Sequence, residues 1–372
     1  MFSIYKKRIE KLKEKLIAKN ITSCVILDPS HIFYFTGTDA PQALIVNVEE
    51  EPVLLSNRLE SYRTEQEKKI GVVYVYSRIS EDLPEHENVI IGDLFQSIGK
   101  ILKEKLKGRG KIGLVGKNLS YESYLKLSNI IGNGVERTDN DVMRMRMLKE
   151  DYEINLIEKA VTITEEVLGK AIEFLDVGVT ENEVVGFIQK EFRKRGALDA
   201  FLPIVAFGPH TSHPHAVPGF RRLKKGDIVK IDMGARFQGY CADITRTFVF
   251  GKASEKQKRL ISIVLKAQKA AIDEVSISVK ASRLDLKARN VLRKYDLAKY
   301  FIHSLGHGVG IEVHEPPYLS SFSNDVIERR MVFTIEPGVY VKDYGGVRIE
   351  DMILVNDEPK LLTSFEKFLE KD

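Results

Sequence analysis

The chain has 372 residues, of which 43% are hydrophobic and 30% charged, and its formal net charge is +4. This length suits two domains and allows a core that needs no structural metal or disulfide. The small charge excess argues against a dedicated nucleic-acid-binding protein. Two distant cysteines, Cys24 and Cys241, form no disulfide framework and favour a cytoplasmic location. No uncharged apolar stretch is long enough to span a membrane, and the charged segment 1–20 is unlike a signal peptide.

Residues 1–140 alternate between helical and strand patterns, which predicts an N-terminal α/β domain. Periodicity predicts helices over 5–19, 57–66 and 95–107. Short apolar runs predict strands over 23–27, 32–36, 42–48, 71–76, 89–91 and 111–115. We interpret Asp28-Pro29 as a turn after the first strand. A polar, irregular stretch follows this domain, and it predicts a domain boundary after residue 140.

Residues 141–372 have a different organisation. Two long amphipathic patterns predict helices over 150–174 and 181–194. From Phe201 onward the sequence is typical of strands and turns, with helical insertions predicted over 255–275 and 282–295. We therefore expect an α+β domain after the α/β domain.

A predicted hairpin brings two aspartates together in the second domain. Segments 227–235 and 240–250 have the apolar, β-branched composition of strands, and 236–239 is a turn candidate. A turn centred on the Phe237–Gln238 bond places Asp232 opposite Asp243. Facing carboxylates in an apolar sheet repel each other unless a cation lies between them.

A second predicted hairpin repeats this arrangement with glutamates. Segments 331–341 and 346–355 read as strands, and a turn centred on Asp343 places Glu336 opposite Glu350. Four carboxylates in one interior site would require about two divalent cations to balance their charge. The sequence therefore predicts a two-metal site.

A histidine completes the predicted ligand set. His307 stands in Gly306-His307-Gly308, where glycines allow other groups to approach closely. Mixed oxygen and nitrogen ligands suit manganese, cobalt, iron or zinc better than calcium. We expect manganese or cobalt, with zinc or iron as alternatives.

Each carboxylate could instead have a structural role when it is considered alone. Asp232 could cap a turn, Asp243 could pair with Arg246 or Arg236, and Glu350 could pair with Arg348. Two mirrored pairs beside a glycine-flanked histidine favour the metal site over these readings.

These residues resemble the prolidase and aminopeptidase P branch of the pita-bread metallopeptidases, which is related to methionine aminopeptidase and creatinase. The resemblance rests on the motifs Pro214-His215, Gly226-Asp227, Asp232-Met233-Gly234, Gly239-Tyr240, Asp243-Ile244-Thr245-Arg246-Thr247, Gly306-His307-Gly308-Val309-Gly310, His314-Glu315, Thr334-Ile335-Glu336-Pro337-Gly338 and Gly346-Val347-Arg348-Ile349-Glu350-Asp351. Asp28-Pro29 and Tyr34-Phe35-Thr36-Gly37 resemble the smaller domain of the creatinase and prolidase branch. The resemblance implies a creatinase-like N-terminal α/β domain over 1–140 and a pita-bread catalytic domain over 141–372.

The resemblance also implies residue roles. The resemblance implies two divalent metal ions per subunit, held by five ligands. Asp243 and Glu350 would each bind both ions. The five ligands are Asp232, Asp243, His307, Glu336 and Glu350. His215 and His314 would contact the substrate, Glu336 would transfer the proton, and Arg348 would support the substrate site.

The implied activity is hydrolysis of the bond between an N-terminal residue and proline. We expect an Xaa-Pro dipeptidase, with an Xaa-Pro aminopeptidase acting on longer peptides as the alternative. Many prolidases carry an Arg near the place of Tyr318, and the chain also has His210 and Ala216 where the family often has Asn and Gly. More distant alternatives are a non-catalytic binding protein, a metal-free creatinase-type enzyme and a methionine aminopeptidase.

The resemblance further implies a homodimer whose loop 37–41, including Asp39, approaches the partner's site. No nucleic-acid or membrane partner is expected.

Overall fold

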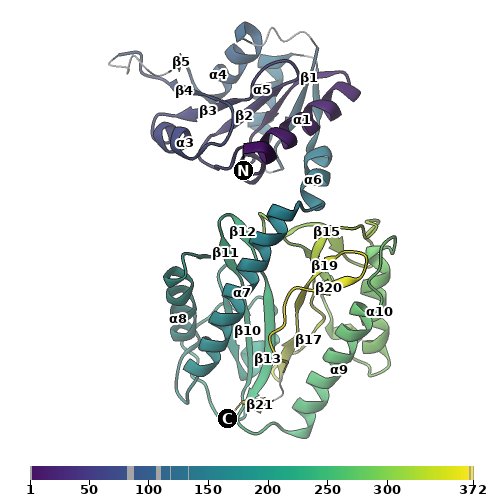
Figure 1. Cartoon of the computed structure of the whole chain (residues 1–372). Coiled ribbons are helices and arrows are strands. Elements are labelled where there is room, and N and C mark those ends of the chain that lie inside the picture. The colour runs from purple at the N-terminus through teal and green to yellow at the C-terminus, as the bar shows by residue number, and fades with distance from the viewer. Residues whose placement is uncertain are drawn as a thin grey trace. The chain divides into compact units, whose positions relative to one another are not determined.

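The computed structural model describes residues 2–81, 88–105, 110–117, 119–132, 134–367 and 370–371. The chain forms two compact units, Met1–Arg146 and Met147–Asp372 (Figure 1). The boundary predicted after residue 140 falls inside the helix that ends the first unit, α6 (Asp139–Met147). None of the described helices is long and apolar enough to cross a membrane.

The first unit is built on one seven-stranded sheet. Its helices are α1 (Phe2–Ala18), α2 (Pro29–Thr36), α3 (Ser61–Glu67), α4 (Leu94–Lys100), α5 (Tyr121–Ile131) and α6, with a π-helical turn over Ile101–Lys105. Its strands are β1 (Ile21–Ile26), β2 (Ala43–Asn47), β3 (Val53–Asn57), β4 (Val72–Ser77), β5 (Val89–Ile91), β6 (Lys111–Val115) and β7 (Val135–Arg137). Residues 106 and 107 of the helix predicted over 95–107 lie outside the described part of the chain.

The strand order is β5-β4-β3-β2-β1-β6-β7. Strand β2 runs antiparallel to both neighbours, and the other pairs are parallel, which makes a mixed sheet. Val25, Ile45 and Leu55 from its central strands are fully buried with Leu127 of α5. The helices therefore cover an apolar sheet, as the alternating sequence pattern predicts.

The strand predicted over 32–36 is wrong, because this segment belongs to helix α2. Asp28 accepts hydrogen bonds from the Ser30 and His31 amides, and Pro29 occupies the first turn. Gly37, with φ 80°, ends the helix in the left-handed conformation. A short apolar run fits a buried helix as well as a strand, and the cap residues decide here.

The second unit combines two helix pairs with antiparallel strands. Its helices are α7 (Asp151–Phe174), α8 (Glu181–Lys194), α9 (Glu255–Ile272) and α10 (Ala281–Arg293), with 3₁₀ turns η2 (Gly208–Ser212) and η3 (Ala298–Tyr300). Its strands are β8 (Leu198–Asp199), β9 (Ile204–Phe207), β10 (Ile228–Met233), β11 (Ala235–Phe237), β12 (Tyr240–Cys241), β13 (Ile244–Phe250), β14 (Gly306–Gly308), β15 (Glu315–Leu319), β16 (Val332–Ile335), β17 (Gly338–Val341), β18 (Gly345–Arg348), β19 (Asp351–Val355), β20 (Pro359–Leu361) and β21 (Glu370–Lys371).

Two similar modules make up this unit. Helices α7 and α8 pack on the sheet β21-β13-β10-β9, with Ile188 and Ile231 buried between them. Helices α9 and α10 pack in the same way on the sheet β15-β14-β16-β19-β20, with Leu284 and Phe333 buried between them. Figure 1 shows the helix pairs on either side of the strands. Asp232 lies in β10, and the other three predicted carboxylates lie directly at the ends of β13, β16 and β19.

Candidate metal centre

The first predicted hairpin forms with a different register. The turn is centred between Gln238 and Gly239, whose φ values of 47° and 89° suit a two-residue hairpin turn. Asp232 therefore faces Thr245, and the prediction that it faces Asp243 is wrong. Moving the turn centre by one residue moves each partner by two, which keeps the same face of the sheet. Asp243 is consequently the diagonal neighbour of Asp232.

The second predicted hairpin has the register that the sequence indicated. Gly338 pairs with Arg348 on one side of the glutamates, and Ile335 pairs with Asp351 on the other. Glu336 and Glu350 lie between these two ladders, across from one another and outside the regular strands. A break in both strands thus places the two carboxylates at one point.

His307 lies in β14, where its neighbours contact two other strands closely. A Cβ atom at Gly306 would collide with the carbonyl oxygen of Thr334, and one at Gly308 would collide with that of Pro316. The Thr334 hydroxyl accepts from the His307 amide at 3.2 Å and donates to Glu336 at 3.3 Å. The glycines therefore allow the close strand packing that brings the His307 imidazole to the carboxylates.

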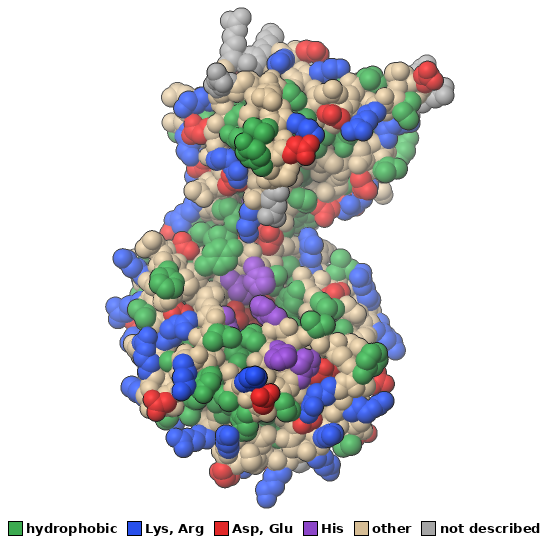
Figure 2. All heavy atoms as spheres, turned by 180° about the vertical axis from the view of Figure 1, so that it is seen from behind, with side chains coloured by type: hydrophobic (Ala, Val, Ile, Leu, Met, Phe, Trp, Pro, Cys, Tyr) green, Lys and Arg blue, Asp and Glu red, His purple; other side chains and the backbone are tan. Residues whose placement is uncertain are grey.

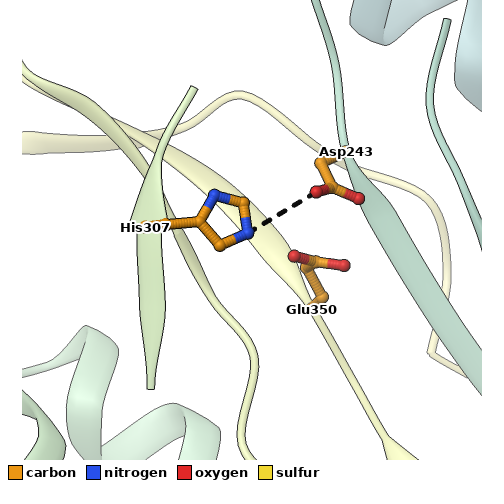
Figure 3. Close-up of side chains that lie close together, drawn as sticks. All are labelled: Asp243, His307 and Glu350. Carbon is orange, nitrogen blue, oxygen red and sulfur yellow. Dashed lines mark ion pairs between the residues drawn. The ribbon is translucent and has the colours of Figure 1, made fainter. Parts of the chain in front are cut away.

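These side chains converge in the interior of the second unit. Single ligand atoms of Asp243, His307 and Glu350 lie within 4.8 Å of one another (Figure 3). The His307 Nε2 atom is 3.7 Å from Asp243 Oδ2 and 3.2 Å from Glu336 Oε1. Asp232 joins the group and is only 6% exposed.

Two oxygen atoms of this cluster have no hydrogen-bond partner. Asp232 Oδ1 and Asp243 Oδ1 are buried without a donor. A buried, unpaired carboxylate oxygen is costly, and a cation is the group that would satisfy it. The donor set of four carboxylates and one imidazole therefore fits divalent transition metals.

The remaining contacts support the carboxylates. Arg348 donates through Nη2 to Asp232 Oδ2 and through Nη1 to the Tyr340 hydroxyl at 2.8 Å. Arg246, which the sequence offered as a partner for Asp243, donates instead to Asp351 at 2.8 Å. Arg348 was likewise considered as a partner for Glu350, but it bonds Asp232.

The electrostatics reflect crowded negative charge. Burial, and then the neighbouring carboxylates, raises the pKa of Asp243 and Glu350 well above the ordinary range. Burial would also raise the pKa of Glu336, but hydrogen bonding and charge from His307 bring it to about 2. Burial opposes protonation of His307, yet Glu336 raises its pKa. Without a cation, the site thus holds protons in place of positive charge.

A cavity of about 480 Å³ opens beside the carboxylates. Histidine side chains gather on this face of the second unit (Figure 2). His215 and His314 both line the cavity, and the ring centroid of His314 lies 4.2 Å from that of His307. Burial, followed by the nearby His307, lowers the pKa of His314. The cavity therefore places two imidazoles beside the predicted ligands, and the neutral form is favoured for His314.

One cavity histidine, His303, was not identified from the sequence. His303 lines the cavity, and its Nε2 atom lies 3.0 Å from the hydroxyl of Tyr340. Burial lowers the pKa of His303 to about 4, so its neutral ring accepts that hydroxyl proton while Nδ1 donates to Ser304 O at 2.8 Å. Six of the eight histidines stand between His210 and His314. This clustering was the only available signal for His303, which lies four residues before His307.

A two-module fold with a buried carboxylate and imidazole cluster beside a cavity defines a metal-dependent enzyme architecture. Residues 155–357 match Metallopeptidase family M24, and residues 8–148 match the Creatinase/Prolidase N-terminal domain. The chain belongs to this metallopeptidase family, and it combines the creatinase-type N-terminal domain with the pita-bread catalytic domain, as predicted.

Similarity to characterised relatives extends over the full length of the chain. It is 35% identical to the Xaa-Pro dipeptidase of Pyrococcus furiosus, covering 98% of this chain and 99% of the relative. A solved Xaa-Pro dipeptidase from Bacillus anthracis superposes with a TM-score of 0.88 at 28% identity, covering 98% and 99% of the two chains. The X-Pro aminopeptidase of Thermotoga maritima gives a TM-score of 0.82 at 30% identity, covering 96% and 99%.

Proposed function

We propose that this protein is a two-metal exopeptidase that hydrolyses the bond between an N-terminal residue and proline, acting as an Xaa-Pro dipeptidase. The observation that carries the proposal is the pair of unpaired buried oxygens, Asp232 Oδ1 and Asp243 Oδ1, inside a cluster that faces a cavity. Similarity to Xaa-Pro dipeptidases over the whole chain supports the substrate class.

Five residues would hold the ions, namely Asp232, Asp243, His307, Glu336 and Glu350. Asp243 and Glu350 are the proposed bridging ligands. The mixed donors favour manganese or cobalt, with zinc or iron as alternatives. When bound, a divalent pair supplies Lewis acidity that lowers the pKa of a water molecule and polarises the scissile carbonyl.

The surrounding residues supply proton transfer and substrate contacts. Glu336 is the proposed proton carrier, because its low pKa keeps it ionised and ready to accept a proton. His314, whose lowered pKa favours the neutral ring, donates a hydrogen bond to the substrate carbonyl. His215 lines the pocket for the residue after the scissile bond, and Arg348 orients Asp232 through a hydrogen bond.

Proline explains why a dedicated pocket is needed. Its nitrogen carries no hydrogen and its ring fixes φ, so a peptidase that binds the N–H of that residue rejects it. The cavity offers Phe201, Ile204 and Tyr318 as ring-contacting side chains. A shaped apolar wall beside the metal site fits a proline ring at the position after the cut.

The alternative is an Xaa-Pro aminopeptidase that accepts longer peptides. Tyr318 lines the cavity and is 40% exposed, at the place where many prolidases carry an Arg for the dipeptide carboxylate. Similarity to an X-Pro aminopeptidase keeps this candidate open.

Hydrolysis of Leu-Pro and Leu-Pro-Gly, after chelation and re-addition of manganese or cobalt, tests the proposal. We expect metal-dependent cleavage of Leu-Pro and little cleavage of the tripeptide. Preferred cleavage of the tripeptide would select the aminopeptidase, and no cleavage with any divalent metal would refute both activities.

We also propose a homodimer in the cytoplasm. Cys24 and Cys241 are both buried free thiols, which suits a reducing compartment. Sedimentation velocity tests the dimer, and a purely monomeric species at micromolar concentration would contradict it. Fractionation of the native cells tests the location.

A further inference from the structure

The inference concerns Lys230 of strand β10 and rests on the proposed function. Lys230 is fully buried, two residues before Asp232. Its Nζ atom donates to the carbonyl oxygens of Thr211 at 3.2 Å, His213 at 2.6 Å and Pro214 at 3.2 Å. An ammonium group has three N–H donors, and these three carbonyls accept all of them.

The three carbonyls belong to the segment that presents His215. The segment comprises η2 and the turn after it, and it contains no strand over 208–219. Backbone without secondary structure needs other partners for its polar groups. Lys230, which lies in the sheet, provides these partners to the carbonyls that directly precede His215.

A buried carboxylate holds the same segment from its two ends. Glu181, at the start of α8, is fully buried and accepts from the Phe207 amide at 2.9 Å and from the Gly219 amide at 3.0 Å. It also contacts His210 Nδ1 at 2.8 Å. The segment is therefore held by a buried carboxyl group through its N–H groups and by the buried amino group of Lys230 through its carbonyls.

The contacts of Lys230 are linked to the predicted metal ligands. The Pro214 carbonyl also accepts from Arg348 Nη1 at 3.1 Å, and Arg348 donates to Asp232. Lys230 Nζ lies 5.2 Å from the ring centroid of Tyr340, which favours a cation above that ring. The turn before His215 is thus connected to a predicted metal ligand through two cationic side chains.

Burying a lysine is expensive, and an apolar residue at this sheet position would fill the core at lower cost. We propose that Lys230 is a positioning residue, which fixes the backbone of 211–214 and thereby sets His215 at the rim of the metal cavity for the peptidase reaction. Lys230 is not among the residues that line the cavity, and it acts through His215.

A double-mutant cycle on kcat/KM for Leu-Pro tests this inference. The four proteins are the wild type, Lys230→Met, His215→Ala and the double variant. We expect Lys230→Met to lower kcat/KM about 10- to 100-fold, because small displacements of a substrate contact are costly. In the His215→Ala background the same change should cost less than about threefold, since the two residues act as a unit. Losses that multiply would overturn the proposal.

Hydrogen exchange provides a readout that does not depend on activity. Lys230→Met should speed amide exchange in 207–219 while leaving α9 and α10 protected. Leu292→Ala, a buried α10 change, is the matched control that destabilises the unit without touching the segment. Equal exchange in 207–219 for Lys230→Met and the wild type would refute the positioning role. If Lys230→Met does not fold, Lys230→Gln, which keeps two donors, takes its place in both experiments.

The two proposals fail in different ways. A wild-type protein that cleaves no Xaa-Pro peptide would refute the proposed function, while the exchange experiment would still decide whether Lys230 fixes the segment. An active wild type with multiplicative losses in the cycle would refute the role of Lys230 alone.

Discussion

The Thr245 hydroxyl donates a hydrogen bond of 2.7 Å to Glu350 Oε2, and the hydroxyl oxygen of Thr245 accepts one of 3.1 Å from Arg348 Nε. Thr245 therefore orients a proposed bridging ligand and connects it to the arginine that holds Asp232. Groups that orient metal ligands contribute strongly to metal affinity even though they do not bind the metal.

Thr245→Val should weaken metal binding by about 10- to 100-fold, because the valine keeps the shape but loses the hydroxyl. Calorimetric titration of manganese into chelator-treated protein measures the change. Thr247→Val is the matched control in the same strand, since the Thr247 hydroxyl bonds the Arg348 backbone and not a carboxylate among the described residues. Equal losses of affinity in the two variants would show that Thr245 does not act on Glu350.

The sequence predicted that these carboxylates cluster because strand pairing preserves the faces of a sheet. The pair Glu336 and Glu350 followed from a turn centred on Asp343, and the ladders on both sides keep that register. The Asp232 pairing failed because the turn centres on Gln238 and Gly239, where a glycine suits the second position of a two-residue turn. The true partner of Asp232 lies two residues from the predicted one, so Asp243 is still on the same face of the sheet as Asp232. The cluster was therefore predicted despite the error in register.

Other features depend on tertiary structure that periodicity does not encode. The apolar segment 32–36 reads equally as strand or helix, and its cap residues make it a helix. His303 enters the cavity from the irregular segment between η3 and β14, so its position depends on how the two modules pack. Lys230 stands in an apolar run whose pattern gives no sign of three backbone acceptors.

Removing the metal should change how stability depends on pH. Asp243 and Glu350 have a pKa raised well above the unfolded value, so the native apo protein binds more protons than the unfolded chain. The free energy of unfolding should then fall as pH rises from about 4 through the raised pKa. The raised pKa of His307 acts in the same direction. Glu336, with a pKa of about 2, opposes this slope in acid, and the lowered pKa values of His303 and His314 oppose it up to about pH 6.5.

Thermal melts of chelator-treated protein between about pH 6.5 and about pH 8 measure this slope above the range in which the two histidines oppose it, and added divalent metal should flatten it. Metal binding should also release protons, which titrations in two buffers of different ionisation enthalpy would detect. Apo stability that increases with pH over this range would contradict the proposed charge balance.

The ion pair between Lys149 and Glu315 should be a large term in the stability of the second unit. The Lys149 Nζ atom lies 2.8 Å from Glu315 Oε1, and both side chains are almost completely buried. Lys149→Met leaves a buried carboxylate without this partner, which should cost about 3–5 kcal/mol in the free energy of unfolding. Urea unfolding followed by hydrogen exchange of the second unit measures the loss.

A surface ion pair provides the control for this experiment. Lys269 bonds Asp273 at 2.9 Å but is 76% exposed, so Lys269→Met should change stability by less than about 0.5 kcal/mol. The double variant Lys149→Met/Glu315→Leu should recover much of the loss, because it removes both charges of the pair. A double variant as unstable as Lys149→Met would assign the loss to packing instead.

Substrate length should respond to Tyr318. This residue lines the cavity and is 40% exposed, so a longer cationic side chain can reach solvent from the same position. Tyr318→Arg should raise kcat/KM for Leu-Pro relative to Leu-Pro-amide by about 10-fold, because a guanidinium would pair with the dipeptide carboxylate. Tyr318→Phe removes only the hydroxyl and should leave that ratio within about twofold of the wild type. An unchanged ratio in Tyr318→Arg would show that the carboxylate of a dipeptide is held elsewhere in the cavity.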